Sequence, residues 1–513
     1  MTKKYDFVIF SMGYMWVHPS NGNITTVKVY DKAAKDEMKS YDVNSDDFYH
    51  KFALRPNRSF GPYKIATFLR QHGYSVKCID FLNSFSLSEV DQLIEKYVSD
   101  QTLAVGFSLS FGNWQFEKFE KDFFERAELI KQRAQKRVIV GGWKNTGKNF
   151  MDQARFNVLA DHVFIDRCER SLLTLLDGIK SNKIDLVFKM NKVINAGKIF
   201  PNSDEDDANL ALILSKEDDD LFYGEPITVE LSRGCIFDCT FCSYEKRGKK
   251  KLDYLIHEDP LYQMFKQNYE NFGIVNYNAA DPTVNDTVEK LEMIARVVDQ
   301  LEFKPKFFSF LRSELLLRYP EQIDLLARIG YVGGAFGIES LHPQAQKSIR
   351  KKISYEDLIS LLTSLNEKIP NFNSVLLMIV GLPYETKEHF EQMLNKLIER
   401  RDLISHIMMF PLFLEHTDLE NIPHVSNFSL NAEEYGYVRS EVNGLGTWKN
   451  ENNNMTWELA NIFVREFAMK VSKMHSTPIP RGFLLGYADF LDNNDLGITL
   501  DNFAEKYKEK VLA

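Results

Sequence analysis

Three cysteines in one short segment are the residues of this chain that most directly suggest chemistry. Cys235, Cys239 and Cys242 are spaced C-x3-C-x2-C, and they are three of the five cysteines among 513 residues. Thiolates hold iron–sulfur clusters, and three of them on one tight loop can bind three irons of a cubane 4Fe–4S cluster. The fourth iron would then lack a protein ligand and could take an exogenous one.

A zinc site or an ordinary protein core could also account for these cysteines. Zinc needs a fourth ligand, for which His257 is the nearest candidate, and the remaining spacing does not fit the usual ligand pairs. A protein core would require three thiols to crowd one loop. The segment follows directly on a predicted strand at residues 227–231, which is where chemistry is found in parallel barrels. We therefore interpret the segment as an iron–sulfur site.

The segment resembles the cysteine loop of the radical S-adenosylmethionine (SAM) superfamily, in which an aromatic residue precedes the last cysteine. Phe241 takes that place here. The resemblance implies that the open iron binds the amino and carboxylate groups of SAM. One electron from the reduced cluster would then cleave SAM to methionine and a 5′-deoxyadenosyl radical that removes hydrogen from a substrate. It also implies an electron donor such as flavodoxin or ferredoxin.

Two further positions resemble SAM-binding motifs of the same superfamily. Asn278, Ala279 and Ala280 end a predicted strand where the family holds the SAM amino group, although the family's glycines are missing. Backbone carbonyls can make that contact. Arg312 follows the next strand, where related enzymes bind the SAM carboxylate, and its forked guanidinium suits that anion. The alternative role for Arg312 is an ordinary surface ion pair.

The resemblance continues in the later strands. The segment GIES contains Glu339 and Ser340, which would face the ribose or the methionine part of SAM. The segment GLPYET begins with Gly381 and has Tyr384 where the family has glycine, and its backbone would lie near the adenine. Glu339 could instead cap a helix. Because all of these motifs stand in order and at strand ends, they support one another.

These residues require a framework of parallel strands. We expect a partial (β/α)6 radical SAM barrel over residues 226–415 because six apolar runs alternate with helical patterns. The chemistry of such barrels lies at the carboxyl ends of the strands. We expect the strands at residues 227–231, 274–278, 307–311, 334–338, 374–380 and 406–410.

A second strand–helix series occupies residues 1–185 and predicts a doubly wound, Rossmann-like sheet. Its combination with the barrel resembles the cobalamin-binding class of the radical SAM superfamily. In that class a serine and a double glycine line the nucleotide tail of the corrin, and Ser108, Gly141 and Gly142 match them. Glycine lets the backbone approach a bulky ligand closely.

Two features depart from that class. The chain has no D-x-H-x-x-G motif, so no histidine is presented as the lower ligand of cobalt. Residues 166–169 read DRCE where the class usually has G-E-G-E, and Arg167 and Cys168 could fill the ligand groove. Two alternatives therefore stay open, namely a bound cobalamin and a degenerate domain that binds none.

The remaining segments are a linker and a C-terminal region. Residues 186–225 contain the acidic runs 204–207 and 217–220, which we interpret as a solvated linker. Residues 416–513 are expected to be mainly helical, to close the barrel mouth and to recognise the substrate. Trp448 and Trp457 in this region could stack on the substrate or serve packing.

Composition excludes several other classes of protein. Charged residues make up 26% of the chain and hydrophobic residues 44%, as in folded domains, and the net charge of −9 argues against a nucleic-acid-binding surface. Apolar runs are far shorter than the roughly 20 residues of a spanning helix. Asp6 interrupts any apolar signal core. We expect a cytoplasmic protein.

The sequence leaves three functions open. The first is a radical SAM enzyme that methylates carbon with cobalamin, on a peptide, a natural-product intermediate or a lipid. The second is a radical SAM enzyme without cobalamin that oxidises, cyclises or cross-links its substrate. The third is a non-catalytic scaffold that carries an iron–sulfur cluster.

Overall fold

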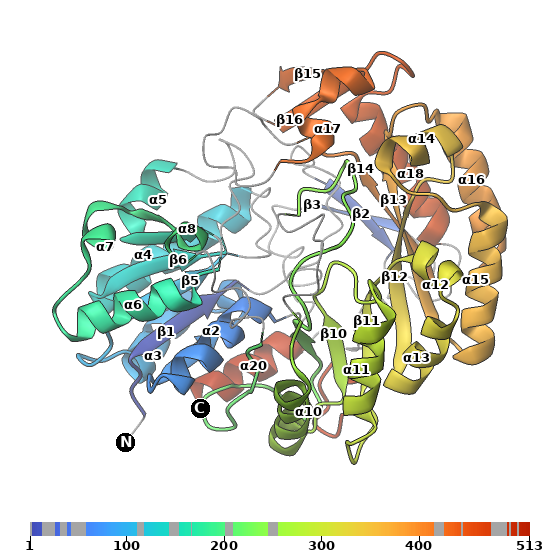
Figure 1. The fold of residues 1–513 in the computed structure, drawn as a ribbon. Helices are drawn as coiled ribbons and strands as arrows, with labels where there is room; N and C mark the ends of the chain where they lie inside the picture. Colours follow the sequence, from blue (N-terminus) through green and yellow to red (C-terminus); the bar gives the residue numbers. More distant parts are fainter. Residues whose placement is uncertain are drawn as a thin grey trace.

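The structure is a computed structural model of residues 1–513. It describes residues 3–12, 26–30, 38–42, 58–109, 117–142, 153–165, 167–200, 209–244, 255–414, 425–442, 445–472, 490–491, 494–499 and 502–513. Two parallel sheets lie side by side, one in each of two α/β domains (Figure 1). No helix of the described residues is long and apolar enough to cross a membrane.

The N-terminal sheet has the order β4-β1-β5-β6-β7-β8, and all of its strands are parallel. Its strands are β1 (Phe7–Ser11), β4 (Val76–Ile79), β5 (Ala104–Ser108), β6 (Arg137–Gly141), β7 (His162–Ile165) and β8 (Val193–Asn195). The expected doubly wound fold is thus confirmed. The sheet continues beyond the expected boundary at residue 185, because β8 pairs with β7.

Helices cover both faces of this sheet. The alternation along β1 explains why, since Phe7 and Ile9 belong to one buried cluster, and Val8 and Phe10 belong to another. On the first face α2 packs against α6, and on the second α3 packs against α4. The helices are α2 (Phe60–Gln71), α3 (Leu87–Tyr97), α4 (Glu117–Ala134), α5 (Gln153–Leu159), α6 (Glu169–Lys180), α7 (Leu186–Met190) and α8 (Ala196–Ile199).

The second sheet is the expected partial barrel, with the order β14-β13-β12-β11-β10-β9 and only parallel pairs. Its strands are β9 (Ile227–Val229), β10 (Asn276–Ala279), β11 (Lys306–Leu311), β12 (Tyr331–Glu339), β13 (Asn373–Val380) and β14 (His406–Pro411). All six occur where the sequence predicts them, with shifted ends.

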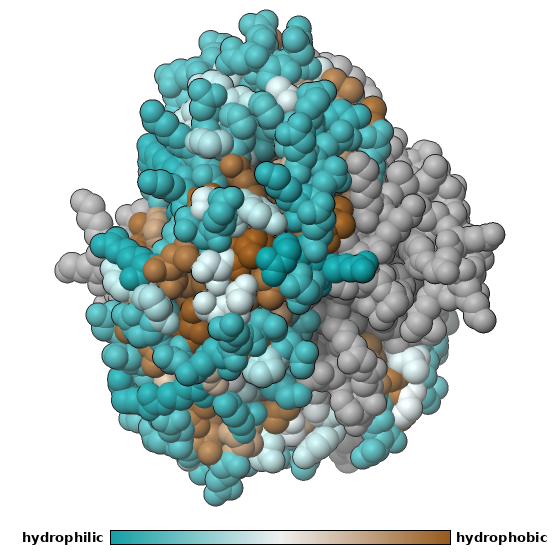
Figure 2. All heavy atoms as spheres, turned by 90° about the vertical axis from the view of Figure 1, so that its right-hand side faces the viewer, coloured by the Kyte–Doolittle hydropathy of each residue, from teal (hydrophilic) through white to brown (hydrophobic). Residues whose placement is uncertain are grey.

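Helices form the outer layer of the barrel domain. They are α10 (Glu258–Phe272), α11 (Val288–Val298), α12 (Ser313–Arg318), α13 (Glu321–Ile329), α14 (Pro343–Ile349), α15 (Tyr355–Lys368) and α16 (Lys387–Glu399). Their apolar sides face the sheet, as expected of amphipathic helices. The face of the molecule that Figure 2 presents is hydrophilic above and below, with an area of hydrophobic residues between.

The C-terminal region divides between the two domains. The hairpin of β15 (Tyr437–Val442) and β16 (Leu445–Asn450) and the helix α18 (Trp457–Ser472) pack on the barrel, where α18 contacts β13 and β14. The helix α20 (Phe503–Leu512) instead packs against α3 of the N-terminal domain (Figure 1). The expectation that residues 416–513 form one region over the barrel mouth is therefore wrong for α20.

The remaining described elements are two hairpin strands, β2 (Thr26–Tyr30) and β3 (Met38–Asp42), the short helix α17 (Asn427–Leu430) and the 3-10 helices η2 (Leu82–Ser84) and η3 (Ala432–Tyr435). The sequence analysis predicts none of them. The acidic run at residues 204–207 and Asp166 lie outside the described residues.

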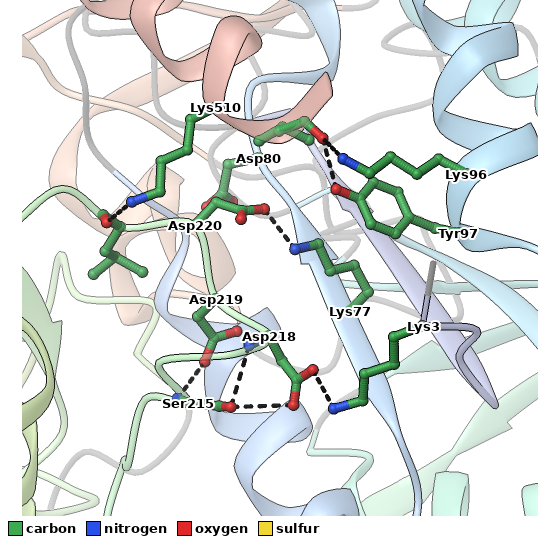
Figure 3. Close-up of polar contacts among 12 residues, drawn as sticks. Lys3, Lys77, Asp80, Lys96, Tyr97, Ser215, Asp218, Asp219, Asp220 and Lys510 are labelled. Carbon is green, nitrogen blue, oxygen red and sulfur yellow. Dashed lines mark hydrogen bonds and ion pairs between the residues drawn. The ribbon is translucent and has the colours of Figure 1, made fainter. Parts of the chain in front are cut away.

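The acidic run at residues 217–220 is not a solvated linker. Asp218 and Asp219 are buried, and each meets a basic residue of the N-terminal domain. Figure 3 shows the pair of Asp218 and Lys3. The Lys3 Nζ lies 2.6 Å from Asp218 Oδ1, and Arg70 donates two hydrogen bonds of 2.7 and 2.8 Å to the Asp219 carboxylate. The prediction is wrong for this run because its charges are neutralised by residues distant in the sequence.

A second contact joins three segments of the chain next to that run. Arg58 donates to both carboxylate oxygens of Glu225, at 2.6 and 2.9 Å, and to Asp80 at 3.0 Å. The Tyr507 ring of α20 lies 4.8 Å from the Arg58 guanidinium carbon, and its hydroxyl accepts the Asp80 N–H at 2.8 Å. This cluster ties the linker and α20 to the first domain.

Candidate functional site

The cysteine loop begins where β9 ends, and a buried ion pair holds its first residues. The Asp281 carboxylate accepts hydrogen bonds from the Leu231 N–H at 2.8 Å and the Ser232 hydroxyl at 2.6 Å. Lys290 lies 2.9 Å from the same carboxylate, and neither side chain of this pair is exposed. Burial disfavours the charge of Lys290, but Asp281 and Asp286 raise its pKa above the usual value. The loop thus starts from a fixed position.

The three cysteines lie in a partly enclosed position at this loop. Cys235 and Cys239 are buried and Cys242 is half-buried. Each sulfur has a polar neighbour, because Cys235 Sγ lies 3.6 Å from the Thr283 hydroxyl and Cys242 Sγ accepts the Tyr244 N–H at 3.4 Å. Cys239 Sγ has the third neighbour, the guanidinium of Arg312, at 3.3 Å.

These residues fit an iron–sulfur cluster, because cluster thiolates accept hydrogen bonds and lie in protected positions. The donor set on the loop consists of sulfur alone. Among the described residues, no three His, Cys, Asp or Glu side chains gather as ligands of one single metal ion. In a cubane cluster each thiolate binds a different iron, so the three sulfurs do not have to share one centre.

Arg312 lies against the cysteine loop. It stands between β11 and α12, and its Nη1 donates to Cys239 Sγ at 3.3 Å. The guanidinium carbon lies 3.6 Å from the centroid of the Phe237 ring, also in the loop, and Nη2 is 3.1 Å from the Glu314 carboxylate. Its Nε is buried and has no hydrogen-bond partner among the described residues. The structure therefore brings this predicted residue to the cysteines.

Lys351, which no sequence motif indicates, contacts the predicted residues Glu339 and Phe241. Its ammonium lies 3.1 Å from the Glu339 carboxylate and 5.8 Å from the centroid of the Phe241 ring. Burial raises the pKa of Glu339, and the nearby Lys351 opposes this shift. Glu339 ends β12 in a left-handed conformation, with φ of 64°. The Lys351 ammonium thus links the Glu339 carboxylate to Phe241 of the cysteine loop.

Ser340 lies next to these residues but is fully enclosed by protein. Its hydroxyl donates to Glu385 Oε1 at 2.6 Å and accepts the His342 N–H at 3.0 Å. Glu385 comes from the GLPYET segment, and burial raises its pKa to about 8, although the Ser340 hydrogen bond opposes the shift. Ser340 therefore connects the ends of β12 and β13 in this structure, and contact with SAM stays a prediction.

The first predicted SAM contact lies at the end of β10. Asn278 and Ala279 are buried and Ala280 is exposed. The Ala280 N–H donates to the Val229 carbonyl at 2.8 Å, which ties this strand end to β9 just before the cysteine loop. The predicted residues and the cysteine loop thus share one edge of the barrel.

Gly381 is required by packing. Its φ is 98°, and a Cβ at this position would lie 2.4 Å from the Trp448 ring of β16. Its carbonyl accepts the Tyr437 hydroxyl at 2.7 Å. Trp448 itself is buried, and its Nε1 donates to the Leu412 carbonyl at 2.8 Å. Packing thus accounts for Trp448, and the proximity of this segment to adenine stays a prediction.

A cavity of about 240 Å³ lies at the carboxyl edge of the N-terminal sheet. Ser108, Gly141 and Gly142 line it, so the structure brings these three predicted residues together. A Cβ on Gly141 would meet nothing within 4 Å, whereas Gly142 has φ of 72°. The cavity therefore has open space at Gly141, and its volume suits a slender part of a cofactor. A larger cavity of about 710 Å³ contains none of the predicted site residues.

Charged side chains form one wall of the smaller cavity. Arg233 lies 2.9 Å from Glu230 and 3.1 Å from Glu169, Lys64 pairs with Glu230, and Arg167 lies 3.8 Å from Glu230. Burial opposes the charge of Glu230, yet Lys64, Arg233 and Arg167 lower its pKa to about 2. Because Glu230 and Arg233 belong to the chain entering the cysteine loop, this wall connects the two candidate sites.

Comparisons with known proteins identify chains of similar sequence and fold. The sequence model of the radical SAM superfamily matches residues 229–397. The structure of the radical S-adenosylmethionine methyltransferase TsrM from Kitasatospora setae, with tryptophan substrate and aza-SAM bound, has a TM-score of 0.57 and 14% identity, covering 85% of this chain and 77% of that one. The cobalamin-dependent S-adenosylmethionine radical enzyme OxsB with aqua-cobalamin bound has a TM-score of 0.53 and 16% identity, covering 84% of this chain and 56% of that one.

Curated relatives match less than half of this chain. The ribosomal protein uS12 methylthiotransferase RimO of Bdellovibrio bacteriovorus is 24% identical over 254 residues, which is 44% of this chain and 53% of the relative. A tRNA-2-methylthio-N(6)-dimethylallyladenosine synthase of Alkaliphilus oremlandii is 22% identical over 44% of this chain and 48% of the relative. The chain therefore spans about half the length of these two relatives.

Proposed function

We propose that this chain, which belongs to the radical SAM superfamily, cleaves SAM reductively at a 4Fe–4S cluster and methylates a substrate carbon with the help of cobalamin. The observation that carries the cobalamin part is the cavity lined by Ser108, Gly141 and Gly142, whose charged wall continues into the cysteine loop. Its position at the carboxyl edge of a doubly wound sheet is where ligands of such sheets bind.

At the first site the chain would hold the cluster through Cys235, Cys239 and Cys242. When bound, the cluster supplies the single electron for SAM cleavage. Two positive charges would stand near the cluster, because Arg312 contacts Cys239 and Lys351 lies 5.8 Å from the Phe241 ring of the same loop. Such fixed charges orient an anionic group without reorganisation, since they are already held by their own partners.

At the second site the open space at Gly141 would admit part of the cobalamin. When bound, cobalamin supplies the methyl group. The buried ion network on the cavity wall fixes the position of Lys64, because each of its charges has an opposite charge within reach. The chain has no D-x-H-x-x-G histidine to bind cobalt, and Ser108, Gly141 and Gly142 would hold the nucleotide tail with its benzimidazole displaced from cobalt, so we expect a base-off spectrum for the bound cofactor.

The substrate is proposed from the family resemblance alone. A peptide, a natural-product intermediate or a lipid fits carbon methylation, and a flavodoxin or ferredoxin fits the need for one electron at a time. We also propose a cytoplasmic location, because reduction of the cluster needs such an electron donor.

A second candidate keeps the radical chemistry and omits cobalamin. Arg167 and Cys168 line the cavity. They stand where the family has the middle Glu and Gly of its G-E-G-E segment, and this observation favours a degenerate domain. The protein would then oxidise, cyclise or cross-link its substrate.

Anaerobic reconstitution tests both candidates. The protein is incubated with iron, sulfide and hydroxocobalamin, desalted, and assayed for iron, cobalt and 5′-deoxyadenosine formed from SAM. About four irons per chain with near-stoichiometric cobalt supports the first candidate. Iron and 5′-deoxyadenosine without cobalt supports the second, and iron without 5′-deoxyadenosine would indicate a non-catalytic scaffold.

A further inference from the structure

Arg312 contacts two residues of the cysteine loop directly, which binding of SAM alone does not require. Its Nη1 donates to Cys239 Sγ at 3.3 Å, and the guanidinium lies on the Phe237 ring at 3.6 Å. Phe237 and Cys239 belong to the same short loop. The positive charge is therefore placed directly beside a thiol that would bind iron.

The surroundings of Arg312 fix this position. Asn285 accepts the Arg312 N–H at 2.8 Å and donates to its carbonyl at 3.1 Å, so the backbone is held from both sides. Nη2 pairs with Glu314 at 3.1 Å and donates to the Arg350 carbonyl at 3.4 Å. The side chain is only 10% exposed. A side chain held in this way keeps its distance to Cys239.

We propose that Arg312 tunes the reduction potential of the cluster through its hydrogen bond to the Cys239 thiolate. This inference rests on the proposed iron–sulfur site. Reduction adds one negative charge to the cluster, and a buried positive charge stabilises that charge more strongly than an exposed one. Hydrogen bonds to cluster sulfurs and the local net charge both set the potential. Arg312 therefore raises the reduction potential of the cluster. The negative charge of Glu314, which pairs with Arg312, partly offsets this increase.

A role in SAM binding alone leads to a different result. If Arg312 served only the SAM carboxylate, its removal would weaken SAM binding and leave the potential of the SAM-free cluster unchanged. The two roles are therefore separated by measuring the potential in the absence of SAM. That measurement does not depend on catalytic turnover.

The test is a potentiometric titration of the reconstituted, SAM-free protein followed by electron paramagnetic resonance. We expect Arg312→Gln to shift the midpoint to a more negative value. The expected change is at least tenfold in the ratio of oxidised to reduced cluster at a fixed potential, which is about 59 mV for one electron. The matched control is Arg350→Gln, since Arg350 pairs with Asp238 of the same loop but is 54% exposed. We expect no comparable shift in the control.

A second variant keeps the proposal testable if Arg312→Gln takes up no iron. Glu314→Gln removes the carboxylate partner of Arg312 and should shift the midpoint in the positive direction. An unshifted midpoint in either iron-loaded variant would overturn the proposal. Failure of the parent protein itself to bind iron would instead overturn the proposed function, so the two failures are distinguishable.

Discussion

The Asp281 carboxylate and the Lys290 ammonium lie 2.9 Å apart beneath the start of the cysteine loop, and neither is exposed to solvent. Asp281 also accepts hydrogen bonds from Leu231 and Ser232, and Lys290 reaches the Ser232 hydroxyl at 2.7 Å. The pair therefore serves two purposes, because it neutralises two buried charges and fixes the residues that lead to Cys235.

Replacing Lys290 by methionine should destabilise the protein strongly. The change leaves the Asp281 carboxylate buried without its partner, which typically costs about 3–5 kcal/mol. The measurement is chemical denaturation of the apoprotein. The control is Arg328→Met, because Arg328 and Asp299 form an ion pair whose members are both 47% exposed. An exposed pair contributes about 0–1 kcal/mol, so similar losses in both variants would contradict the prediction.

The buried carboxyl of Glu385 should make stability depend on pH. Its pKa in the folded protein is raised to about 8 from the usual 4.5, mainly by burial. A raised pKa means that the folded state keeps its proton while the unfolded state loses it. The contribution of this group to folding is complete below pH 4.5 and is lost as the pH rises to about 8.

Glu385→Gln should remove this dependence, because the amide has the shape of the protonated acid and does not titrate. The gain in unfolding free energy of the variant over the parent should grow between about pH 5 and pH 8. The increase in this gain over the whole pH range should exceed about 1.4 kcal/mol, which corresponds to a pKa difference of one unit. Parallel denaturation curves across this pH range check the prediction, and a constant difference at every pH would refute it.

The cavity at the N-terminal sheet offers a test of cobalamin binding through Gly141. A Cβ there meets nothing, so Gly141→Val should fill open space without displacing protein. We expect less cobalt retained after reconstitution and desalting, with unchanged iron. Gly142 is less suited to this purpose, because its φ of 72° strains any larger residue whether or not a ligand is present. Equal cobalt in parent and variant would show that this cavity is not the corrin site.

Tyr507 of α20 should stabilise the first domain although it is distant in sequence. Its ring is fully buried, and its hydroxyl accepts the Asp80 N–H. Tyr507→Ala should cost about 3–5 kcal/mol, as for other large buried aromatic residues. Lys506→Ala on the exposed side of the same helix should stay within about 0.5 kcal/mol. Thermal denaturation of both variants compares them, and a tolerated Tyr507→Ala would mean that α20 is dispensable.

The strands were predictable because their signal is local. The apolar runs at β11 and β13 and the C-x3-C-x2-C spacing can be recognised within a few residues. The pairing of Asp218 with Lys3 could not be predicted in this way, because the partners are 215 positions apart. Lys351 was missed for the same reason, since it stands in a short basic segment eleven residues after GIES and belongs to no motif. Local patterns thus revealed the framework and the loop, and tertiary contacts determined which charges surround them.

The packing of α20 against the N-terminal domain also affects the order in which the chain can fold during synthesis. Domains generally fold as units from the N-terminus while the chain is made. Here the cluster of Arg58, Asp80 and Glu225 lacks the Tyr507 ring until residues 503–512 have left the ribosome. The apolar surface of the first domain under α20 is therefore covered only after all the barrel strands have been made.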